Sequence, residues 1–317
     1  MKKKYLLIYN PHSGDKKRIF SVTQKITLED ILALFKRNNI TVDVAQTSHE
    51  NHAEELTKNA IRQGYDVVIA AGGDGTIGEI ANILVGTKTA LGILPLGTYM
   101  NVARMLSIPT DLEKAIELIK KGNTRDVDAG AVTRLEGEKL REPYYFLESA
   151  GVGLEAEIHD HAQALEHGDL REIWKIIKTV KEYYSYPTKV IINNSETIET
   201  KATVITISNG SYTGPAINIA PQAKLDDHRL TVSLFTMSKF ELIRFLLRVK
   251  TGSTAHSKHI QVYRAKEVKI LTRKKRKVHA DARLFGETPV EFKSKPKAIT
   301  VITGAVSKDT FFINKNK

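Results

Sequence analysis

The chain has 317 residues, about twice the length of an average domain, so it can bury a sizeable core without covalent cross-links. Its 41% hydrophobic and 26% charged residues are typical of a globular protein, and the absence of cysteine excludes disulfides, iron–sulfur clusters and cysteine-ligated zinc. Lys and Arg exceed Asp and Glu by 12, which favours an anionic partner such as nucleic acid, a phosphate-bearing cofactor or an anionic bilayer surface.

No sequence segment predicts a leader or a membrane span. The lysines at positions 2–4 are followed by only five residues before Asn10 and Pro11, which is far shorter than the apolar region of a signal peptide. No run of about 18 apolar residues occurs anywhere. We therefore expect a cytoplasmic protein.

Short apolar segments alternate with amphipathic helices through the first 125 residues. The predicted strands cover residues 3–9, 41–45, 66–71 and 90–95. Between the first two, Leu28, Ile31 and Phe35 recur at helical spacing, and a helix over 76–84 follows the third. Because both faces of such a sheet must be covered, residues 1–125 predict a doubly wound, mostly parallel α/β domain.

After residue 125 the pattern changes to strands with few helices between them. The predicted strands cover residues 126–133, 144–148, 188–192, 203–207, 230–235, 268–271 and 299–302. One helix is predicted over 154–184, and another opens at Ser238 with Glu241 in capping-box spacing. We expect a second, β-rich and sandwich-like domain over 126–304, with the tail at 305–317 free to pack back onto the first domain.

The most informative motif is Gly72-Gly73-Asp74-Gly75-Thr76, which follows the third strand and opens a helix. Three glycines leave the backbone bare, so its N–H groups can approach phosphate oxygens closely. Asp74 is suited to holding Mg²⁺, and Glu79 adds a second carboxylate one turn later. The alternative is a glycine turn with an Asp cap. A dinucleotide fingerprint is disfavoured, because that motif normally follows the first strand and needs an acidic residue about 20 positions on.

Small and hydroxyl-bearing residues also follow the other predicted strands of the first domain. They are Asn10, Pro11, His12, Ser13 and Gly14 after the first strand, Thr47 after the second and Thr98 after the fourth. Ligands of open α/β sheets collect at the carboxyl ends of the strands. These loops together therefore predict a site for a nucleoside triphosphate.

In their order and spacing these motifs resemble those of the bacterial diacylglycerol-kinase-type lipid kinases. The similar segments are Asn10 to Gly14, Gly72 to Thr76, and Pro95-Leu96-Gly97-Thr98 followed by Asn101 and Arg104. In the second half, residues 221–227 resemble the family's structural Mg²⁺ loop, and Asp281 with Gly286 to Pro289 resembles the segment that carries its catalytic base. The resemblance covers about residues 4–304.

The resemblance implies a role for each matching residue. Asn10 to Gly14, Thr47, Gly72 to Glu79 and Thr98 bind ATP, and Asp74 serves the Mg²⁺ that bridges its phosphates. Lys224, Asp227 and Arg229 hold a structural Mg²⁺, the first and last through backbone carbonyls. Asp281 accepts the proton of a lipid hydroxyl and faces the terminal phosphate across a cleft between the two domains.

The sequence departs from the family pattern at three positions. Met100 stands where an Asn or Asp is usual, Arg283 replaces a glutamate after the catalytic base, and His228 replaces a glycine in the metal loop. Arg283 could either lower the pKa of Asp281 or clamp a phosphate. His228 could strain its turn.

The family implies a diacylglycerol-like lipid substrate and transient contact with an anionic membrane surface. The basic run at 273–277 is either a solvated strand end or part of that contact, and no nucleic-acid reader motif accompanies it. An NAD kinase and a catalytically weak nucleotide- or lipid-binding relative are the alternative functions. The oligomeric state stays open, a homodimer included.

Overall fold

A computed structural model gives the arrangement of the chain. It describes residues 3–13, 26–136, 142–158, 161, 171–214, 217–250, 259–281 and 283–304. The predicted tail at 305–317 lies outside the described residues, as does Gly14. Among the described residues, no helix combines the length and the apolarity that a membrane crossing requires.

The described residues form two compact units. Those before Asp128 and after Ala298 make up the first unit, and Asp128–Ala298 make up the second. The predicted second domain runs to residue 304, but the described residues from Ile299 to Gly304 belong to the first unit. The reason is that Val301, in the last strand, pairs in parallel with Leu91 of the first unit.

The first unit is built on a parallel sheet. Its strands are β1 (Tyr5–Tyr9), β2 (Asp43–Gln46), β3 (Val67–Gly72) and β4 (Ala90–Pro95). They lie in the order β2-β1-β3-β4, and the end of β18 (Val290–Ile302) adds to β4. Every residue of β3 and β4 is buried, which explains why these strands are continuous apolar runs rather than alternating ones.

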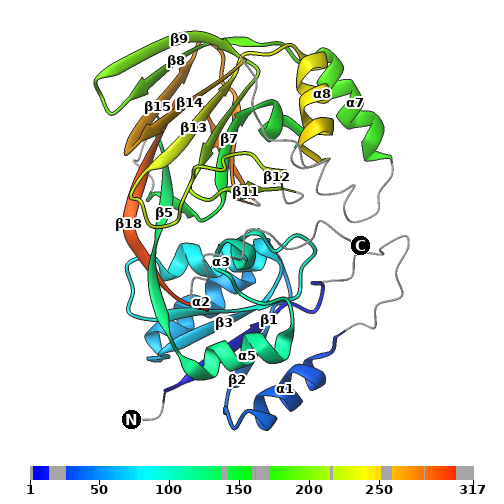
Figure 1. Ribbon diagram of the computed structural model, residues 1–317, viewed down its shortest axis with the longest axis vertical. Coiled ribbons are helices and arrows are strands. Elements are labelled where there is room, and N and C mark those ends of the chain that lie inside the picture. The colour runs from blue at the N-terminus through cyan, green and yellow to red at the C-terminus, as the bar shows by residue number, and fades with distance from the viewer. Residues whose placement is uncertain are drawn as a thin grey trace. The chain divides into compact units, whose positions relative to one another are not determined.

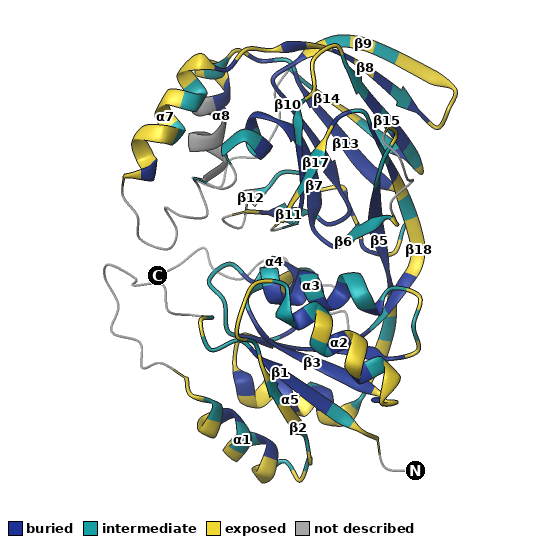
Figure 2. Ribbon diagram, turned by 180° about the vertical axis from the view of Figure 1, so that it is seen from behind, coloured by how far each residue is buried: buried dark blue, intermediate teal, exposed yellow. Residues whose placement is uncertain are grey.

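Helices cover both faces of this sheet, as the two opposite views show (Figures 1 and 2). They are α1 (Leu28–Arg37), α2 (His52–Arg62), α3 (Asp74–Leu84), the short α4 (Asn101–Met105) and α5 (Leu112–Lys121). In α1, Thr27 and Asp30 form a capping box, and Ile31 and Phe35 are buried at the predicted helical spacing. The predicted doubly wound α/β architecture is thereby confirmed.

The second unit is a sandwich of two antiparallel sheets. One has the order β14-β13-β10-β7-β16-β17, with strands Ile260–Ala265, Leu230–Phe235, Val204–Ser208, Ser149–Gly153, Lys277–Ala280 and Arg283–Glu287. The other contains β18, β15 (Glu267–Thr272), β8 (Tyr186–Ile192) and β9 (Glu196–Ala202). Buried residues from both sheets form one core, with Phe146 packed edge-on against Phe292.

The remaining elements connect or flank these sheets. They are β5 (Thr124–Arg134), β6 (Tyr144–Phe146), α7 (Glu172–Glu182), β11 (Tyr212–Thr213), β12 (Ile217–Asn218) and α8 (Lys239–Lys250). Only part of the predicted helix over 154–184 falls on described residues, where Leu154 to Ile158 and α7 are helical. The predicted β-rich character of this half of the chain is confirmed.

Candidate active site

The glycine-rich segment forms the junction between β3 and α3. Gly72 ends the strand and Gly73 is the residue before the helix, whose first turn receives no hydrogen bond from a capping side chain. A Cβ on Gly72 would lie 2.6 Å from the Cβ of Thr76, so no side chain fits there. The N–H groups of the first helical turn have no intrahelical acceptors, which suits them to phosphate oxygens.

The loop after β1 is tied to this junction by two hydrogen bonds. The Nδ2 of Asn10 donates to the hydroxyl of Thr76 at 2.9 Å, and the N–H of Gly73 donates to the hydroxyl of Ser13 at 3.1 Å. The N–H of His12 donates to the Oδ1 of Asn10, which closes the turn. Residues 60 positions apart therefore meet as the sequence predicts for neighbouring strand ends.

The loop after β4 approaches the same glycines from the other side. A Cβ on Gly97 would lie 2.6 Å from the Cα of Gly73 and 2.8 Å from the sulfur of Met100. The N–H of Gly97 donates to that sulfur at 3.1 Å, and Met100 is buried with φ at 51°. The thioether thus holds the loop, a role that the sequence did not reveal.

Asp74 is the first residue of α3 and is half-buried. One carboxylate oxygen accepts a long hydrogen bond, 3.4 Å, from the N–H of Val102 at the start of α4. Thr76 and Glu79 lie two and five residues further along the same helix and so do not share a face with Asp74. A carboxylate at the start of this helix fits Mg²⁺ bound together with a nucleotide's phosphates.

The other predicted ATP-binding residues lie at strand ends of the first unit. Thr47 follows β2, and its N–H donates to the carbonyl of Tyr9 at 3.0 Å. Thr98 lies in the loop after β4 and Pro11 in the loop after β1, both half-buried, while His12 is exposed. The carboxyl ends of β1 to β4 therefore carry the described members of the predicted set.

In the second unit, Asp281 follows β16 and its carboxylate is held by three backbone N–H groups. Leu147 donates to one oxygen at 2.9 Å, and Glu148 and Ser149 donate to the other at 2.9 and 3.2 Å. The N–H of Asp281 in turn donates to the carbonyl of Ser149 at 2.8 Å. Three N–H donors stabilise the ionised carboxylate and set its direction.

The segment that holds Asp281 is itself anchored by buried side chains. The amide of Asn209 donates to the carbonyls of Leu147 and Asp128, each at 3.0 Å, and Ser149 bonds to Thr213 through their hydroxyls at 2.8 Å. Sequence reasoning missed these residues. The one signal that the sequence offered was an Asn shortly after the predicted strand over 203–207.

His279 lies two residues before Asp281 and is almost completely buried. Its Nε2 is 3.3 Å from a carboxylate oxygen of Glu155. Burial works to lower the pKa of His279, but the nearby carboxylates of Glu155 and Asp281 outweigh it and leave that pKa raised. A Cβ on Gly151 would lie 2.3 Å from this nitrogen, so only glycine leaves room for the pair.

The loop predicted to hold a structural Mg²⁺ has a different cation at its centre. The guanidinium of Arg264 forms an ion pair with the carboxylate of Asp227 and also donates to the carbonyl of Gln222 and the hydroxyl of Thr231. The other oxygen of Asp227 accepts the N–H of Arg229. Lys224 and Arg229 are exposed.

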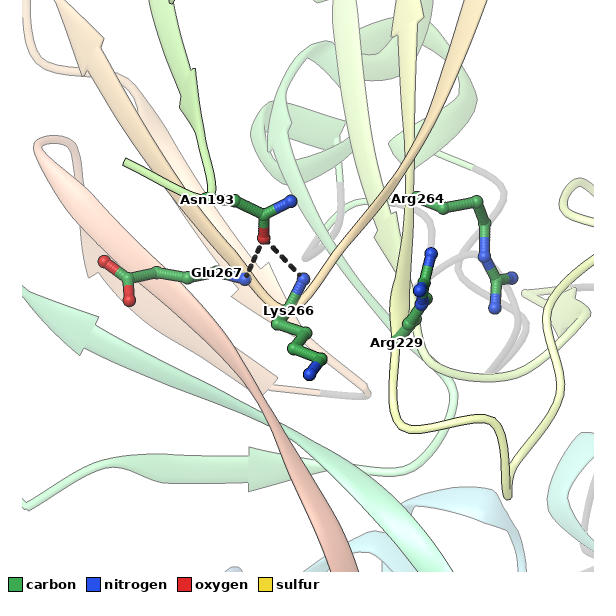
Figure 3. A pocket seen from close by; sticks show the side chains of 5 residues that line it. All are labelled: Asn193, Arg229, Arg264, Lys266 and Glu267. Carbon is green, nitrogen blue, oxygen red and sulfur yellow. Dashed lines mark hydrogen bonds between the residues drawn. The ribbon is translucent and has the colours of Figure 1, made fainter. Parts of the chain in front are cut away.

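A cavity of about 330 Å³ beside this loop is lined by Arg229, Arg264 and Lys266, together with Asn193 and Glu267 (Figure 3). Three cationic side chains make this a poor environment for a dication. The residues present therefore do not fit the Mg²⁺ that the resemblance implied at Lys224, Asp227 and Arg229.

The two other departures from the family pattern also have a structural explanation. His228 has φ at 60°, and both its N–H and its ring nitrogen bond to the buried carboxylate of Asp128, which offsets the strain of that conformation. Arg283 lies over the ring of Tyr144, with its guanidinium carbon 5.5 Å from the ring centroid.

Two family models match the chain and together span most of it. The first, described as a diacylglycerol kinase catalytic domain, matches residues 4–132. The second, a YegS C-terminal NAD kinase beta sandwich-like domain, matches residues 148–303. Both halves of the chain thus match domains of diacylglycerol-kinase-like proteins, and curated diacylglycerol kinases align along nearly its whole length. The family resemblance stated from the motifs is confirmed, and members of this family are phosphotransferases with an alcohol group as acceptor.

Similar proteins cover nearly the whole chain. A diacylglycerol kinase of Bacillus subtilis is 28% identical over 95% of this chain and 96% of its own, and one of Staphylococcus saprophyticus is 26% identical over 96% of each. A solved diacylglycerol kinase from Bacillus anthracis has a TM-score of 0.69 at 22% identity, covering 96% of this chain and 97% of its own. A yeast NADH kinase shares the fold, with a TM-score of 0.53 at 10% identity, covering 98% of this chain and 86% of its own.

Proposed function

We propose that this lipid kinase transfers the γ-phosphate of ATP, with Mg²⁺, to the hydroxyl of a diacylglycerol-like lipid at the cytoplasmic membrane surface. Asp281 carries the proposal, because a carboxylate oriented by three backbone N–H donors is ready to accept a hydrogen bond from an alcohol. The names of the similar proteins support the lipid as acceptor.

In this mechanism the first unit binds ATP. The bare backbone from Gly72 to Gly75 and the first turn of α3 hold the phosphates, and Asn10, Ser13 and Thr76 keep that segment in place through their side chains. Asp74 contributes to binding Mg²⁺, which would neutralise the charge that develops on the phosphate oxygens.

The second unit prepares the acceptor. Asp281 takes the hydroxyl proton while the lipid oxygen forms a bond to the γ-phosphorus and the bond to the leaving ADP oxygen breaks. The adjacent His279–Glu155 pair joins a buried imidazole to a half-buried carboxylate and is an ion pair when His279 is protonated, and it supports the strand that precedes Asp281. His279 therefore acts as a positioning residue.

An acceptor panel tests the proposal. Purified protein is incubated with γ-labelled ATP and Mg²⁺ together with diacylglycerol, monoacylglycerol, ceramide or NAD, and the products are separated. Labelled phosphatidic acid is the expected product. Labelled NADP would contradict the proposal in favour of an NAD kinase, whose relatives share the fold. Tight ATP binding without turnover of any acceptor would contradict it in favour of a silent binding protein.

A further inference from the structure

Helix α7 exposes large apolar side chains on one face. Trp174 is 73% exposed, Ile177 is 51% and Ile173 is 40%. Residues 173 and 177 are four apart and Trp174 lies in the adjoining row, so the three share one stripe of the helix. Val180, seven residues after Ile173 and so close to the same row, packs against the buried cluster around Phe235 and Tyr186, and the three exposed side chains project into solvent beside this packed edge of the helix. Burying the exposed stripe would therefore require a partner.

The start of α8 extends this apolar stripe. The ammonium of Lys239 donates to the carbonyl of Lys181 and lies 5.4 Å from the ring centroid of Tyr184, which brings the first turn of α8 to the end of α7. Tyr184 is 72% exposed and Phe240 is 74% exposed. Helices α7 and α8 lie side by side in both views (Figures 1 and 2). We call Ile173, Trp174, Ile177, Tyr184 and Phe240 the α7–α8 face.

Basic residues surround this face. Lys175, Lys178 and Lys181 lie on α7 and are exposed, and Lys239 stands beside Tyr184. The acidic Glu172 is buried against Lys175 and His161, which leaves Glu182 as the exposed acid of α7. Aromatic and aliphatic side chains among lysines are the pattern of a helix that lies in a bilayer interface, where the lysine ammoniums reach anionic headgroups.

A second copy of the chain suits this face less well than a bilayer does. Two copies docked through it would place lysines against lysines, and like charges in an interface repel one another. An anionic lipid surface instead attracts each lysine. The charge distribution therefore selects a lipid partner.

We infer that the α7–α8 face inserts into the interfacial region of an anionic bilayer and docks the enzyme on the surface that contains its substrate. This inference rests on the proposed function for its purpose, but it can be measured without ATP or catalysis. It also assigns membrane contact to residues outside the basic run at 273–277, for which the sequence left both a solvated strand end and a membrane contact open.

Trp174 is the only tryptophan of the chain, so its fluorescence reports directly on this face. The protein is titrated with vesicles of equal parts phosphatidylglycerol and phosphatidylcholine, and with vesicles of phosphatidylcholine alone. We expect the emission to shift to shorter wavelength with the anionic vesicles, brominated acyl chains to quench it, and added salt to weaken binding. An emission spectrum that anionic vesicles leave unchanged would overturn the inference.

The double variant Ile177→Ser, Phe240→Ser keeps the reporter and removes apolar surface. Its vesicle partitioning should fall by about tenfold or more, whereas Val262→Ser, at an exposed valine of the same unit, should partition like the wild type. Equal partitioning of the double variant would refute the role of this face, as would a spectral shift that depends on protein concentration without lipid.

Circular dichroism and thermal unfolding establish that both variants are folded. Kinase activity toward a short-chain diacylglycerol in solution separates the two proposals: the double variant should retain it. If the wild type binds vesicles but phosphorylates no lipid, the proposed function is contradicted, whereas the membrane-docking role of the α7–α8 face is supported.

Discussion

Asp281 depends on residues that are distant in sequence. Its three N–H donors lie 132 to 134 positions earlier, and its own backbone has φ at 47°, a conformation that a non-glycine residue adopts at some cost. The hydrogen bond from its N–H to Ser149 helps to offset that cost. The hydrogen bonds with residues 147–149 thus both hold the strained backbone of Asp281 and orient its carboxylate.

The His279–Glu155 pair makes stability depend on pH. Because the pKa of buried His279 is raised above that of the unfolded chain, the pair stabilises the fold fully below about pH 6.5, and that stabilisation is lost as pH rises through the folded-state pKa. Urea unfolding of the wild type and His279→Gln at several pH values measures this. The wild type should be the more stable at low pH, with a difference that shrinks as pH rises. A difference that grows with pH would contradict the assignment.

Gly97 tests the packing of the phosphate loop. In Gly97→Ala the new Cβ would lie 2.6 Å from the Cα of Gly73, so one of the two loops must shift. We expect KM for ATP to rise by about tenfold or more, which corresponds to about 1.4 kcal/mol, with KM for the lipid unchanged. Steady-state kinetics with each substrate varied in turn provides the measurement. An unchanged KM for ATP would show that the close packing of Gly97 against Gly73 is not needed for ATP binding.

Sequence reasoning was most successful for loops that follow neighbouring strands of one sheet. The loop after β1 and the glycine-rich junction were expected to meet for that reason, and Asn10 donates to Thr76 while Ser13 accepts from Gly73. Asp281 was singled out through the family resemblance alone. Its donors at Leu147 to Ser149 were missed because backbone N–H groups leave no signature in side-chain types.

At the scale of elements, β14 and the loop before β13 are joined by Arg264. Its guanidinium links Gln222, Asp227 and Thr231. This ion pair engages the carboxylate at which the motif suggested a metal, and the sequence could not show it because Arg264 is 37 residues from Asp227. The residues of the loop alone do not show that a distant strand, β14, supplies the positive charge that pairs with Asp227.

Arg264→Gln should therefore destabilise the protein by about 1–3 kcal/mol, because Asp227 would lose its charged partner. Arg244→Gln, at an exposed position of α8, should have little effect. Without nucleotide, Mg²⁺ and EDTA should give the wild type the same Tm. A Tm that falls with EDTA and recovers with Mg²⁺ would contradict this role of Arg264 and restore the structural metal site.

The elements themselves were predicted unevenly, for physical reasons. The buried strands β1, β3 and β4 are continuous apolar runs and were found at nearly their observed bounds. Strand β9 and strand β14 were missed, since β9 is largely exposed and rich in polar residues and β14 combines Gln, Tyr and Arg. Their pairing with β8 and β13 decides their conformation.

At the scale of the whole molecule, the chain makes its two units from interleaved segments. Strand β5 leaves the first unit at Val127, and β18 returns to it at Ile299, so that Val301 pairs with Leu91 across 210 residues of sequence. Composition and periodicity predicted the change in architecture near residue 125. They could not predict that β18 returns to the first unit, because the partner of a strand depends on tertiary packing.

The central claim is that Asp281 is the catalytic base of a lipid kinase whose ATP site lies in the first unit. The most direct test compares initial rates of phosphatidic acid formation by the wild type, Asp281→Asn, and Glu199→Gln, an exposed carboxylate on β9 that serves as the matched control. We predict that Asp281→Asn reduces kcat by about 10²–10⁴ while ATP binding stays close to wild type, and that Glu199→Gln leaves the rate unchanged. The Tm of Asp281→Asn should fall, because its amide NH2 would face one of the backbone N–H donors, so rates are compared at a temperature at which the variant is folded. A rate for Asp281→Asn equal to that of the wild type would contradict the account.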